Sequence, residues 1–244
     1  MRFFISRILK NVPFLFKKWN ILLEGLDRHY YRKISGKYII IPFGTYCLPR
    51  VIVALGRLKP KKFYGEKTCP FDLLFSDLYG NVNLLKAGFE DFFDDIIFDK
   101  NKNYYINKKY NIEFFHDGNL TYEEFRVRYS NRIRNLLEYL NDKRHVYFLI
   151  ATFEVPETFC LKDLAETVKK YRKNDSFDII VINQSKTKVE TEISNVHMID
   201  LTSDMKFERI NREGNWVQEL KYMKTLAARR FYNKLLRELK KIIK

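Results

Sequence analysis

The fold is decided by residues 146–183, which read VYFLIATFEVPETFCLKDLAETVKKYRKNDSFDIIVIN. The apolar runs at 146–153 and 177–183, rich in β-branched and aromatic residues, predict two buried strands. Between them, residues 161–173 have the apolar spacing of a helix. A strand, a helix and a strand in this order form a right-handed crossover between parallel strands. The stretch therefore predicts an α/β fold built on a parallel sheet.

The same alternation continues on both sides of this stretch. Residues 38–43 (YIIIPF) and 196–201 (VHMIDL) predict two more strands. Residues 48–58 have helical spacing, and Pro49 is tolerated in the first turn of such a helix. The first strand and the first helix are joined by only a few residues, so a sharp turn is expected between them.

The segment between the first helix and residues 146–183 is less regular. Thr121 and Glu124 form a capping-box pattern at the start of a long, Arg-rich helix. Residues 111–115 (NIEFF) predict a short strand of the same sheet, and the polar run at 100–110 predicts an exposed loop or a hairpin. The whole pattern predicts a largely parallel sheet flanked by helices on both faces.

The composition is that of a globular chain. Of 244 residues, 46% are hydrophobic and only nine are Gly and six Pro, which excludes disordered, collagen-like and low-complexity proteins. Three cysteines without a CxxC pair argue against a disulfide framework and favour a reducing compartment, hence the cytoplasm. No run of 18 apolar residues predicts a membrane-spanning helix. We expect one α/β domain at 38–215, with an N-terminal extension at 1–37 and a basic C-terminal helix at 216–244.

The formal net charge of +15 lies entirely in the two ends of the chain. Residues 1–37 hold nine basic residues against two acidic ones, and residues 221–244 hold nine against one. The stretch between them is neutral, with 27 basic and 27 acidic residues. The neutral domain body is therefore not expected to bind nucleic acid, and binding of nucleic acid or another acidic polymer through the basic ends is a third possible function.

Both ends also carry apolar side chains at helical spacing between the bases. In the N-terminal extension the apolar side chains include Phe3, Phe4, Phe14, Phe16 and Trp19. In the C-terminal helix they are Trp216, Leu220, Met223, Ala227, Phe231, Leu235 and Leu239. Such amphipathic helices can pack on the core, or they can lie on an anionic membrane. Both interpretations stay open, and the second predicts peripheral contact with the inner membrane.

Parallel sheets bind ligands beyond the carboxyl ends of their strands, so the residues there are the first candidates for a site. Cys47 follows the first strand, His116 and Asp117 follow the strand at 111–115, and Asp200 ends the last strand. A nucleophile, a base and carboxylates are therefore expected at one rim. Asp117 also suits a turn, and Asp200 also suits the start of an ordinary loop.

Cys47 is expected at the N-terminus of the first helix. Unpaired backbone N–H groups and the positive end of the helix dipole stabilise a thiolate there, and the same N–H groups can hold an oxyanion. A cysteine nucleophile needs a base within hydrogen-bond reach, and His116 is the best placed of the four histidines. The alternative is that Cys47 is a packed small hydrophobe. Cys69 and Cys160 are expected to be structural.

Several motifs follow one another in an order found in a bacterial family. They are FGTYCLPRVIVALGRL at 43–58, PFD at 70–72, the pair His116 and Asp117, and RYSNRIRNLLEYL at 128–140 leading into VYFLIATF. Over about residues 38–155 the chain resembles the bacterial papain-like cysteine peptidases, a family of unknown function. The resemblance implies a cysteine hydrolase linked to surface-polysaccharide systems. It also implies that Cys47 is the nucleophile, His116 the base and Asp72 an orienting residue.

The chain departs from the pattern of that family at two positions. Gly44 and Cys47 match it, but Tyr46 stands where many members carry Asn, so a side-chain oxyanion donor is in doubt there. Leu73 replaces the Trp that follows Pro-Phe-Asp. A papain-like fold packs its cysteine helix against an antiparallel sheet. The alternation of strands and helices in this chain predicts a parallel sheet instead, and a parallel sheet is what we expect.

Other residues complete the predicted site. Gly44, Tyr46, Asp117 and Asp200 are candidates for substrate binding or for a third catalytic member. Asp72 is also suited to cap the helix that follows it. No metal is predicted, because neither HxH nor HxxxH occurs, and no cofactor, because neither GxGxxG nor GxxxxGK[ST] occurs.

Two functions from different classes follow from these observations. The first is a cysteine-dependent hydrolase or acyl-transfer enzyme acting on a peptide, an amide or a glycan-linked substrate. The second is a noncatalytic binding or scaffolding protein for glycan assembly at the inner membrane, in which Cys47 is a packed residue.

Overall fold

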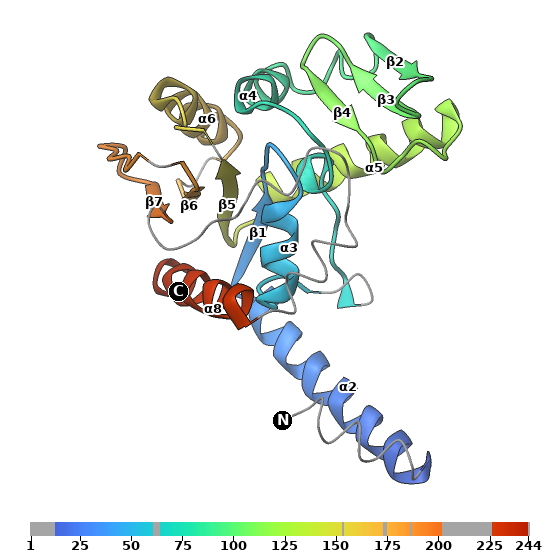
Figure 1. Cartoon of the computed structure of the whole chain (residues 1–244), viewed down its shortest axis with the longest axis vertical. Helices are drawn as coiled ribbons and strands as arrows, with labels where there is room; N and C mark the ends of the chain where they lie inside the picture. The colour runs from blue at the N-terminus through green and yellow to red at the C-terminus, as the bar shows by residue number, and fades with distance from the viewer. Residues whose placement is uncertain are drawn as a thin grey trace.

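A four-stranded parallel sheet forms the centre of the molecule (Figure 1). The computed structural model describes residues 13–60, 64–152, 154–172, 175–185, 187–201 and 226–243. The strands lie in the order β1 (Tyr38–Pro42), β5 (His145–Thr152), β6 (Phe177–Asn183) and β7 (Val196–Asp200), and all neighbouring pairs are parallel. The predicted α/β fold with a parallel sheet is confirmed.

Helices cover both faces of this sheet. Successive residues of a strand point to opposite faces, so Ile40 and Ile41 belong to different apolar clusters. The cluster around Ile40 includes side chains of α3 and α8, and the cluster around Ile41 includes side chains of α4, α5 and α6. These helices are α3 (Leu48–Leu55), α4 (Leu78–Lys86), α5 (Tyr122–Leu140), α6 (Thr158–Tyr171) and α8 (Leu226–Ile242).

A second, antiparallel sheet lies between α4 and α5 along the chain. It consists of β2 (Ile96–Asp99), β3 (Tyr104–Asn107) and β4 (Ile112–Phe114) in that order. The prediction that residues 111–115 belong to the parallel sheet is therefore wrong. Short turns return the chain directly to its neighbour, so β4 pairs with β3 rather than with β1 or β5. An exposed loop or a hairpin was predicted for residues 100–110, and a hairpin turn there joins β2 to β3.

The helix starts show how local sequence sets the elements. Thr121 caps α5, and Glu124 completes the capping box, as the pattern predicts. The prediction that Asp72 caps the next helix is wrong. Asp72 ends the short 3₁₀ helix η2 (Pro70–Asp72), and the side chain that accepts from the first turn of α4 is that of Asp77, which bonds the N–H of Gly80.

The two ends of the chain are helical where they are described. α2 (Pro13–Ser35) projects from the body and joins it at its carboxyl end, where Tyr31 and Ile34 are buried (Figure 1). In α8, Leu235 and Leu239 are fully buried against the sheet, so the end of this helix packs on the core. The apolar positions Phe3, Phe4, Trp216, Leu220 and Met223 lie outside the described residues.

Candidate active site

Cys47 and His116 lie side by side in the folded protein. The Sγ atom of Cys47 is 3.6 Å from Nε2 of His116, although the two residues are 69 positions apart in the chain. Cys47 is buried, whereas His116 is exposed on one side to solvent. The spacing is that of a thiol and an imidazole sharing a hydrogen bond, so the structure brings together the predicted nucleophile and the predicted base.

A tight turn after β1 places Cys47. A side chain at Gly44 would begin only 2.6 Å from the carbonyl oxygen of Tyr46 and 2.8 Å from the ring of Pro49, so glycine is needed there. The carbonyl oxygen of Gly44 accepts a hydrogen bond from the side-chain amide of Asn81 at 3.1 Å. Ser76 donates its backbone N–H to Thr45 at 3.0 Å. These contacts fix the turn against α4 and the segment before it.

Cys47 is the N-cap residue of α3. Pro49 has no N–H, and the first backbone bond of the helix runs from Val51 to the Cys47 carbonyl. The N–H groups of Leu48 and Arg50 therefore have no acceptor within the helix. Unpaired N–H groups at a helix N-terminus can hold an anion, and the helix dipole favours negative charge there.

His116 is held by the turn that follows β4. The backbone N–H of Asp117 donates to the carbonyl of Phe114 at 3.0 Å, which closes the turn. The buried carboxylate of Asp117 accepts from the hydroxyl of Tyr129 at 2.7 Å and from Arg128 on the same helix. Asp117 thus ties the His116 turn to α5, and its predicted role in the turn is consistent with these contacts.

The surroundings of His116 keep its imidazole neutral. Desolvation by neighbouring protein atoms lowers the pKa of His116 below its usual value of about 6.5. The negative charge of Asp117 opposes this shift, and the positive charge of Arg132 adds to it. A neutral imidazole at pH 7 can accept a proton from the thiol of Cys47.

The other two cysteines lie in different environments. Burial raises the pKa of Cys69 far above the ordinary range, despite the nearby positive charge of Lys59. Burial also raises the pKa of Cys160, to about 11, and the carboxylate of Glu157 contributes to the rise. A raised pKa favours the protonated thiol near neutral pH, and the protonated form of a cysteine is a poor nucleophile.

Asp72 belongs to a buried ion cluster. Its carboxylate lies 3.2 Å from the ammonium of Lys59 and 3.9 Å from the guanidinium of Arg50, and Lys59 lies 3.2 Å from Glu66. Lys59, Glu66 and Asp72 are almost completely buried. These contacts link α3, η2 and the loop between them, so they give Asp72 a structural role beside the site. The orienting role that the resemblance implies stays a prediction.

The structure places Asp200 away from Cys47 and bonds the side chain of Tyr46 to the residue that follows β6. Asp200 accepts from the side-chain amide of Asn183 at 2.7 Å and ends β7, which is three strand spacings, or about 14 Å, from β1. The strand order therefore separates Asp200 from Cys47. The hydroxyl of Tyr46 instead accepts from the amide of Gln184, at the end of β6.

Three buried polar atoms around the site have no hydrogen-bond partner in the described part of the chain. They are Oδ1 of Asn81, Oε1 of Gln184 and an amino nitrogen of Arg132. Asn81 holds Gly44, Gln184 holds Tyr46, and Arg132 lies 3.7 Å from Asp117. Unpaired buried polar atoms are rare in folded proteins. The sequence did not identify Asn81 as a candidate, because a polar residue on a helix is usually solvated, and it marked Arg132 only as one of several arginines on a predicted helix.

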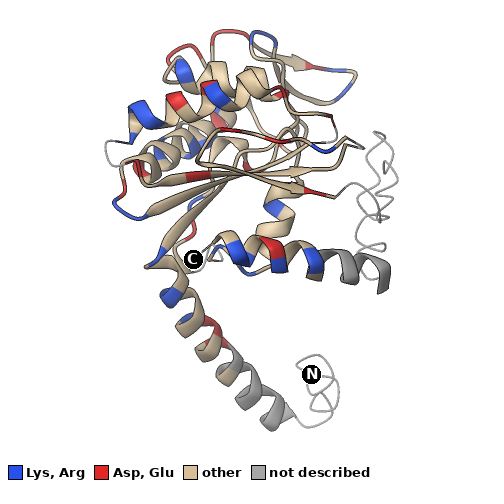
Figure 2. Cartoon of the chain, turned by 90° about the vertical axis from the view of Figure 1, so that its left-hand side faces the viewer, with Lys and Arg blue, Asp and Glu red and all other residues tan. Residues whose placement is uncertain are grey.

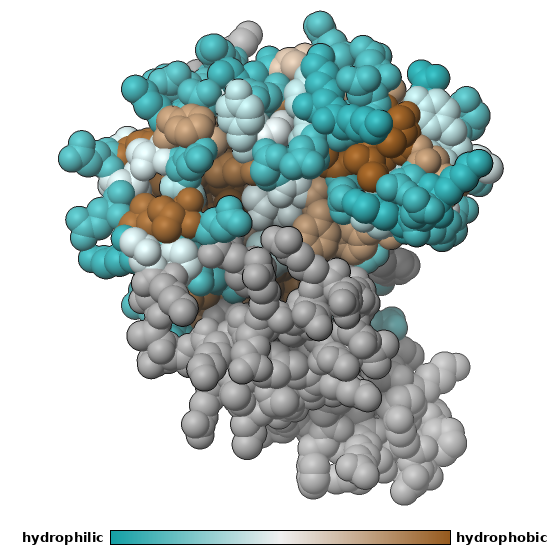
Figure 3. Space-filling view, turned by 45° about the horizontal axis from the view of Figure 1, so that its top comes forward, coloured by the Kyte–Doolittle hydropathy of each residue, from teal (hydrophilic) through white to brown (hydrophobic). Residues whose placement is uncertain are grey.

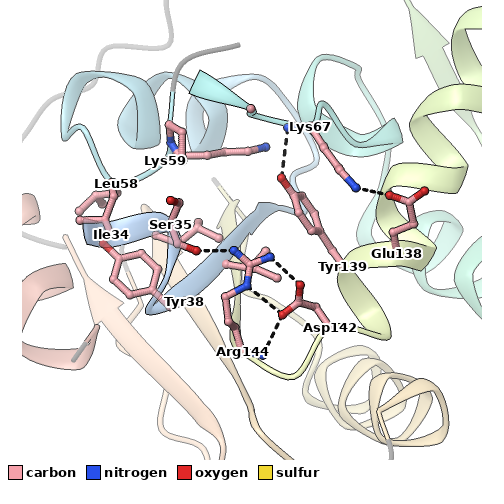
Figure 4. A pocket seen from close by; sticks show the side chains of 14 residues that line it. Ile34, Ser35, Tyr38, Leu58, Lys59, Lys67, Glu138, Tyr139, Asp142 and Arg144 are labelled. Atoms are coloured by element: carbon pink, nitrogen blue, oxygen red, sulfur yellow. Dashed lines mark hydrogen bonds and ion pairs between the residues drawn. The ribbon is translucent and has the colours of Figure 1, made fainter. Parts of the chain in front are cut away.

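Two cavities lie elsewhere on the surface. One, of about 470 Å³, is lined by Asp77, Tyr79 and Tyr110 among others. The other, of about 120 Å³, lies at the amino ends of β1 and β5 (Figure 4). Its cations are already paired, since Arg144 donates to Asp142 and Lys67 to Glu138. Neither of these two cavities is lined by Cys47 or His116.

Other kinds of site find no support in the described residues. No group of three or more His, Cys, Asp or Glu side chains there is arranged to hold a metal ion. No described helix has both the length and the apolar character that crossing a membrane requires. No protein-family model, no curated protein and no solved structure matches the chain. The resemblance to papain-like peptidases therefore stays a prediction.

Proposed function

We propose that the protein is a cysteine-dependent hydrolase or acyl-transfer enzyme in which Cys47 is the nucleophile and His116 the base. The observation that carries this proposal is the separation of 3.6 Å between Sγ of Cys47 and Nε2 of His116. The thiol also lies at the start of α3, where two backbone N–H groups have no acceptor within the helix. A nucleophile, a base and oxyanion donors in one place are the parts that acyl transfer needs.

The first half of the reaction follows from these positions. His116 takes the thiol proton, and the Cys47 thiolate attacks the carbonyl carbon of the substrate. The carbonyl oxygen becomes an oxyanion, which the N–H groups of Leu48 and Arg50 stabilise. The tetrahedral intermediate then collapses, the bond to the leaving group breaks, and the imidazolium of His116 protonates that group. A thioester on Cys47 remains.

The second half returns the enzyme to its starting state. His116 takes a proton from water, or from an acceptor amine or alcohol, which attacks the thioester carbonyl. The thiolate of Cys47 leaves and recovers the proton from His116. His116 is exposed to solvent, so water and larger acceptors have access to the base. The bond cleaved in the biological substrate is of the amide, ester or thioester class.

Trapping of the acyl-enzyme tests this function. With p-nitrophenyl acetate, the wild-type protein is expected to release p-nitrophenol in a burst and to carry an acetyl group on the peptide that contains Cys47. Cys47→Ala is expected to abolish the burst, and Cys160→Ala to leave it unchanged. Acetylation spread evenly over the three cysteines, or none at Cys47, would favour the noncatalytic scaffold instead.

We also propose that the protein binds the surface of a membrane, and this proposal rests on α2. Leu22 and Leu26 are exposed on this helix, at 53% and 49%, close to the exposed bases Arg28, Arg32 and Lys33. Figure 2 shows further basic residues, coloured blue, along α8. Apolar side chains beside bases suit the surface of an anionic membrane. The enzyme would then act at the cytoplasmic face of the inner membrane, in the surface-polysaccharide system that the resemblance implies.

A further inference from the structure

Three aromatic side chains form a continuous row beside the Cys47–His116 pair. Tyr46 directly precedes Cys47, and its ring stacks on that of Phe75 with centroids 6.5 Å apart. The ring of Phe75 lies 5.2 Å from that of Phe115. Phe115 in turn lies 4.1 Å from the imidazole of His116. The aromatic row of Tyr46, Phe75 and Phe115 therefore runs from the nucleophile to the base.

The middle of the aromatic row is fixed by the backbone on both sides. Phe75 donates its N–H to the carbonyl of Glu113 at 3.0 Å, and the N–H of Glu113 donates to the carbonyl of Phe75 at 2.7 Å. Ser76 donates its N–H to Thr45 at 3.0 Å and its hydroxyl to Gly44 at 3.4 Å. This segment joins the turn of Cys47 to β4, which leads to His116. The backbone of Phe75 is thus held in place, and its ring packs against those of Tyr46 and Phe115.

The aromatic row offers apolar area to a ligand. Phe75 is 45% exposed although it is held in place. The hydroxyl of Tyr46 is engaged by Gln184, so what this residue presents is its ring. Tyr79 and Phe159, at the starts of α4 and α6, are also exposed, with rings 6.3 Å apart. Figure 3, seen from the side of these helices, shows apolar areas between hydrophilic side chains.

We propose that the aromatic row binds an apolar acyl group of the substrate and that Phe75 is a specificity-determining residue. The inference rests on the proposed function, since it takes the acyl carbon to be attacked by Cys47. A reacting carbon must lie about 3 to 3.5 Å from the sulfur, so the chain attached to it passes along the adjacent rings. Exposed, rigid aromatic rings next to a nucleophile favour an aliphatic or aromatic group there over a charged one.

Two alkylating probes test this without a known substrate. For each protein we measure the rate constant of alkylation at Cys47 with N-hexyl iodoacetamide and divide it by the rate constant with iodoacetamide. The same ratio measured for free N-acetylcysteine is the reference. We expect the wild-type ratio to exceed the reference about tenfold, the gain from burying roughly two methylene groups. A wild-type ratio equal to the reference would overturn the proposal.

Variants test whether the aromatic row causes the raised ratio of the two rate constants. Phe75→Ala is expected to bring the ratio close to the reference, and Phe75→Tyr to keep the wild-type value. Phe98→Ala removes a comparably exposed ring on β2, at 40% exposure, and is expected to change nothing. If Phe75→Ala does not fold, Phe75→Asn replaces it in the test, and this variant is expected to lower the ratio. An unchanged ratio in the folded variant would show that Phe75 does not select the acyl group.

The same data separate this inference from the proposed function. If iodoacetamide reacts selectively at Cys47 but the hexyl probe gains nothing, the catalytic pair stands and the apolar acyl site fails. If iodoacetamide reacts at Cys47 no faster than at Cys69 and Cys160, the proposed function itself fails. Occupation of the aromatic row by a second copy of the chain would appear as a ratio that falls as protein concentration rises, and would also overturn the acyl site.

Discussion

At the scale of single residues, His116 is set between two opposite charges. Asp117 raises the pKa of His116 and Arg132 lowers it, while desolvation is the largest influence and lowers it. The carboxylate of Asp117 is itself buried and bonded to Tyr129 and Arg128. Desolvation is therefore the main influence on the protonation of the base, and the charges of Asp117 and Arg132 adjust it in opposite directions.

Two variants should move the pKa of His116 in opposite directions. Asp117→Asn removes the negative charge and is expected to lower this pKa further, so that the imidazole stays neutral to a lower pH. Arg132→Gln removes the positive charge and is expected to raise it. An NMR titration of the His116 ring measures both. Shifts in the same direction would contradict the electrostatic assignment.

How far single residues could be predicted depends on what kind of contact they make. Cys47 and His116 were identified because each follows a predicted strand, and the two lie 3.6 Å apart in the structure. The expectation that they share one rim of the parallel sheet is wrong, because β4, which leads to His116, belongs to the antiparallel sheet. Asp200 was expected at the same rim but ends a strand three positions away. Phe75 and Asn81 carried no signal, because contacts between distant segments leave no local pattern in the sequence.

At the scale of elements, the turn from β1 to α3 decides where Cys47 lies. Gly44→Ala would place a Cβ atom 2.6 Å from the Tyr46 carbonyl. We expect this variant to lose about 1–3 kcal/mol of unfolding free energy, the usual cost of overpacking. It should also lose the selective reactivity of Cys47. Urea unfolding and alkylation measure the two effects.

Gly25→Ala is the matched control for this turn. Gly25 lies in α2, and no atom stands within 4 Å of the Cβ position there. This control should gain about 0.5–1 kcal/mol, because alanine favours a helix. Equal stability changes in the two variants would show that the turn is not tightly packed.

The elements themselves could be predicted where a periodic pattern covers them. The strands of the parallel sheet and the crossover α6 follow from apolar runs and helical spacing, and the capping box marked the start of α5. β2 was missed and β4 was assigned to the wrong sheet. Both are only three or four residues long, and the pairing of such short strands is decided by the hairpin turns and by packing on α5.

At the scale of the whole molecule, the net charge and the candidate active site lie in different parts of the chain. The net charge lies in the two ends, and the Cys47–His116 pair lies in the neutral body. Leu235 and Leu239 bind α8 to the core, whereas α2 projects with exposed leucines (Figure 1). α2 is therefore the element through which an anionic surface would be bound.

Vesicle co-sedimentation tests this role of α2. Binding is expected with vesicles that contain phosphatidylglycerol but not with phosphatidylcholine alone, and is expected to weaken with salt. The double variant Leu22→Ser, Leu26→Ser should bind several-fold more weakly. Val127→Ser, at a residue 62% exposed on α5, is the matched control and should bind as the wild type does. Binding without any dependence on lipid charge would contradict the proposal.

The central claim is that Cys47 and His116 act as a pair, and the pH dependence of iodoacetamide labelling tests it most directly. Labelling is followed at each cysteine in the wild type and in His116→Ala, with Cys69 and Cys160 as internal controls. We predict that Cys47 labels fastest near neutral pH, below the usual thiol pKa of about 8.5, and loses this advantage without His116. Labelling of Cys47 no faster than the controls, and unchanged by His116→Ala, would contradict the account.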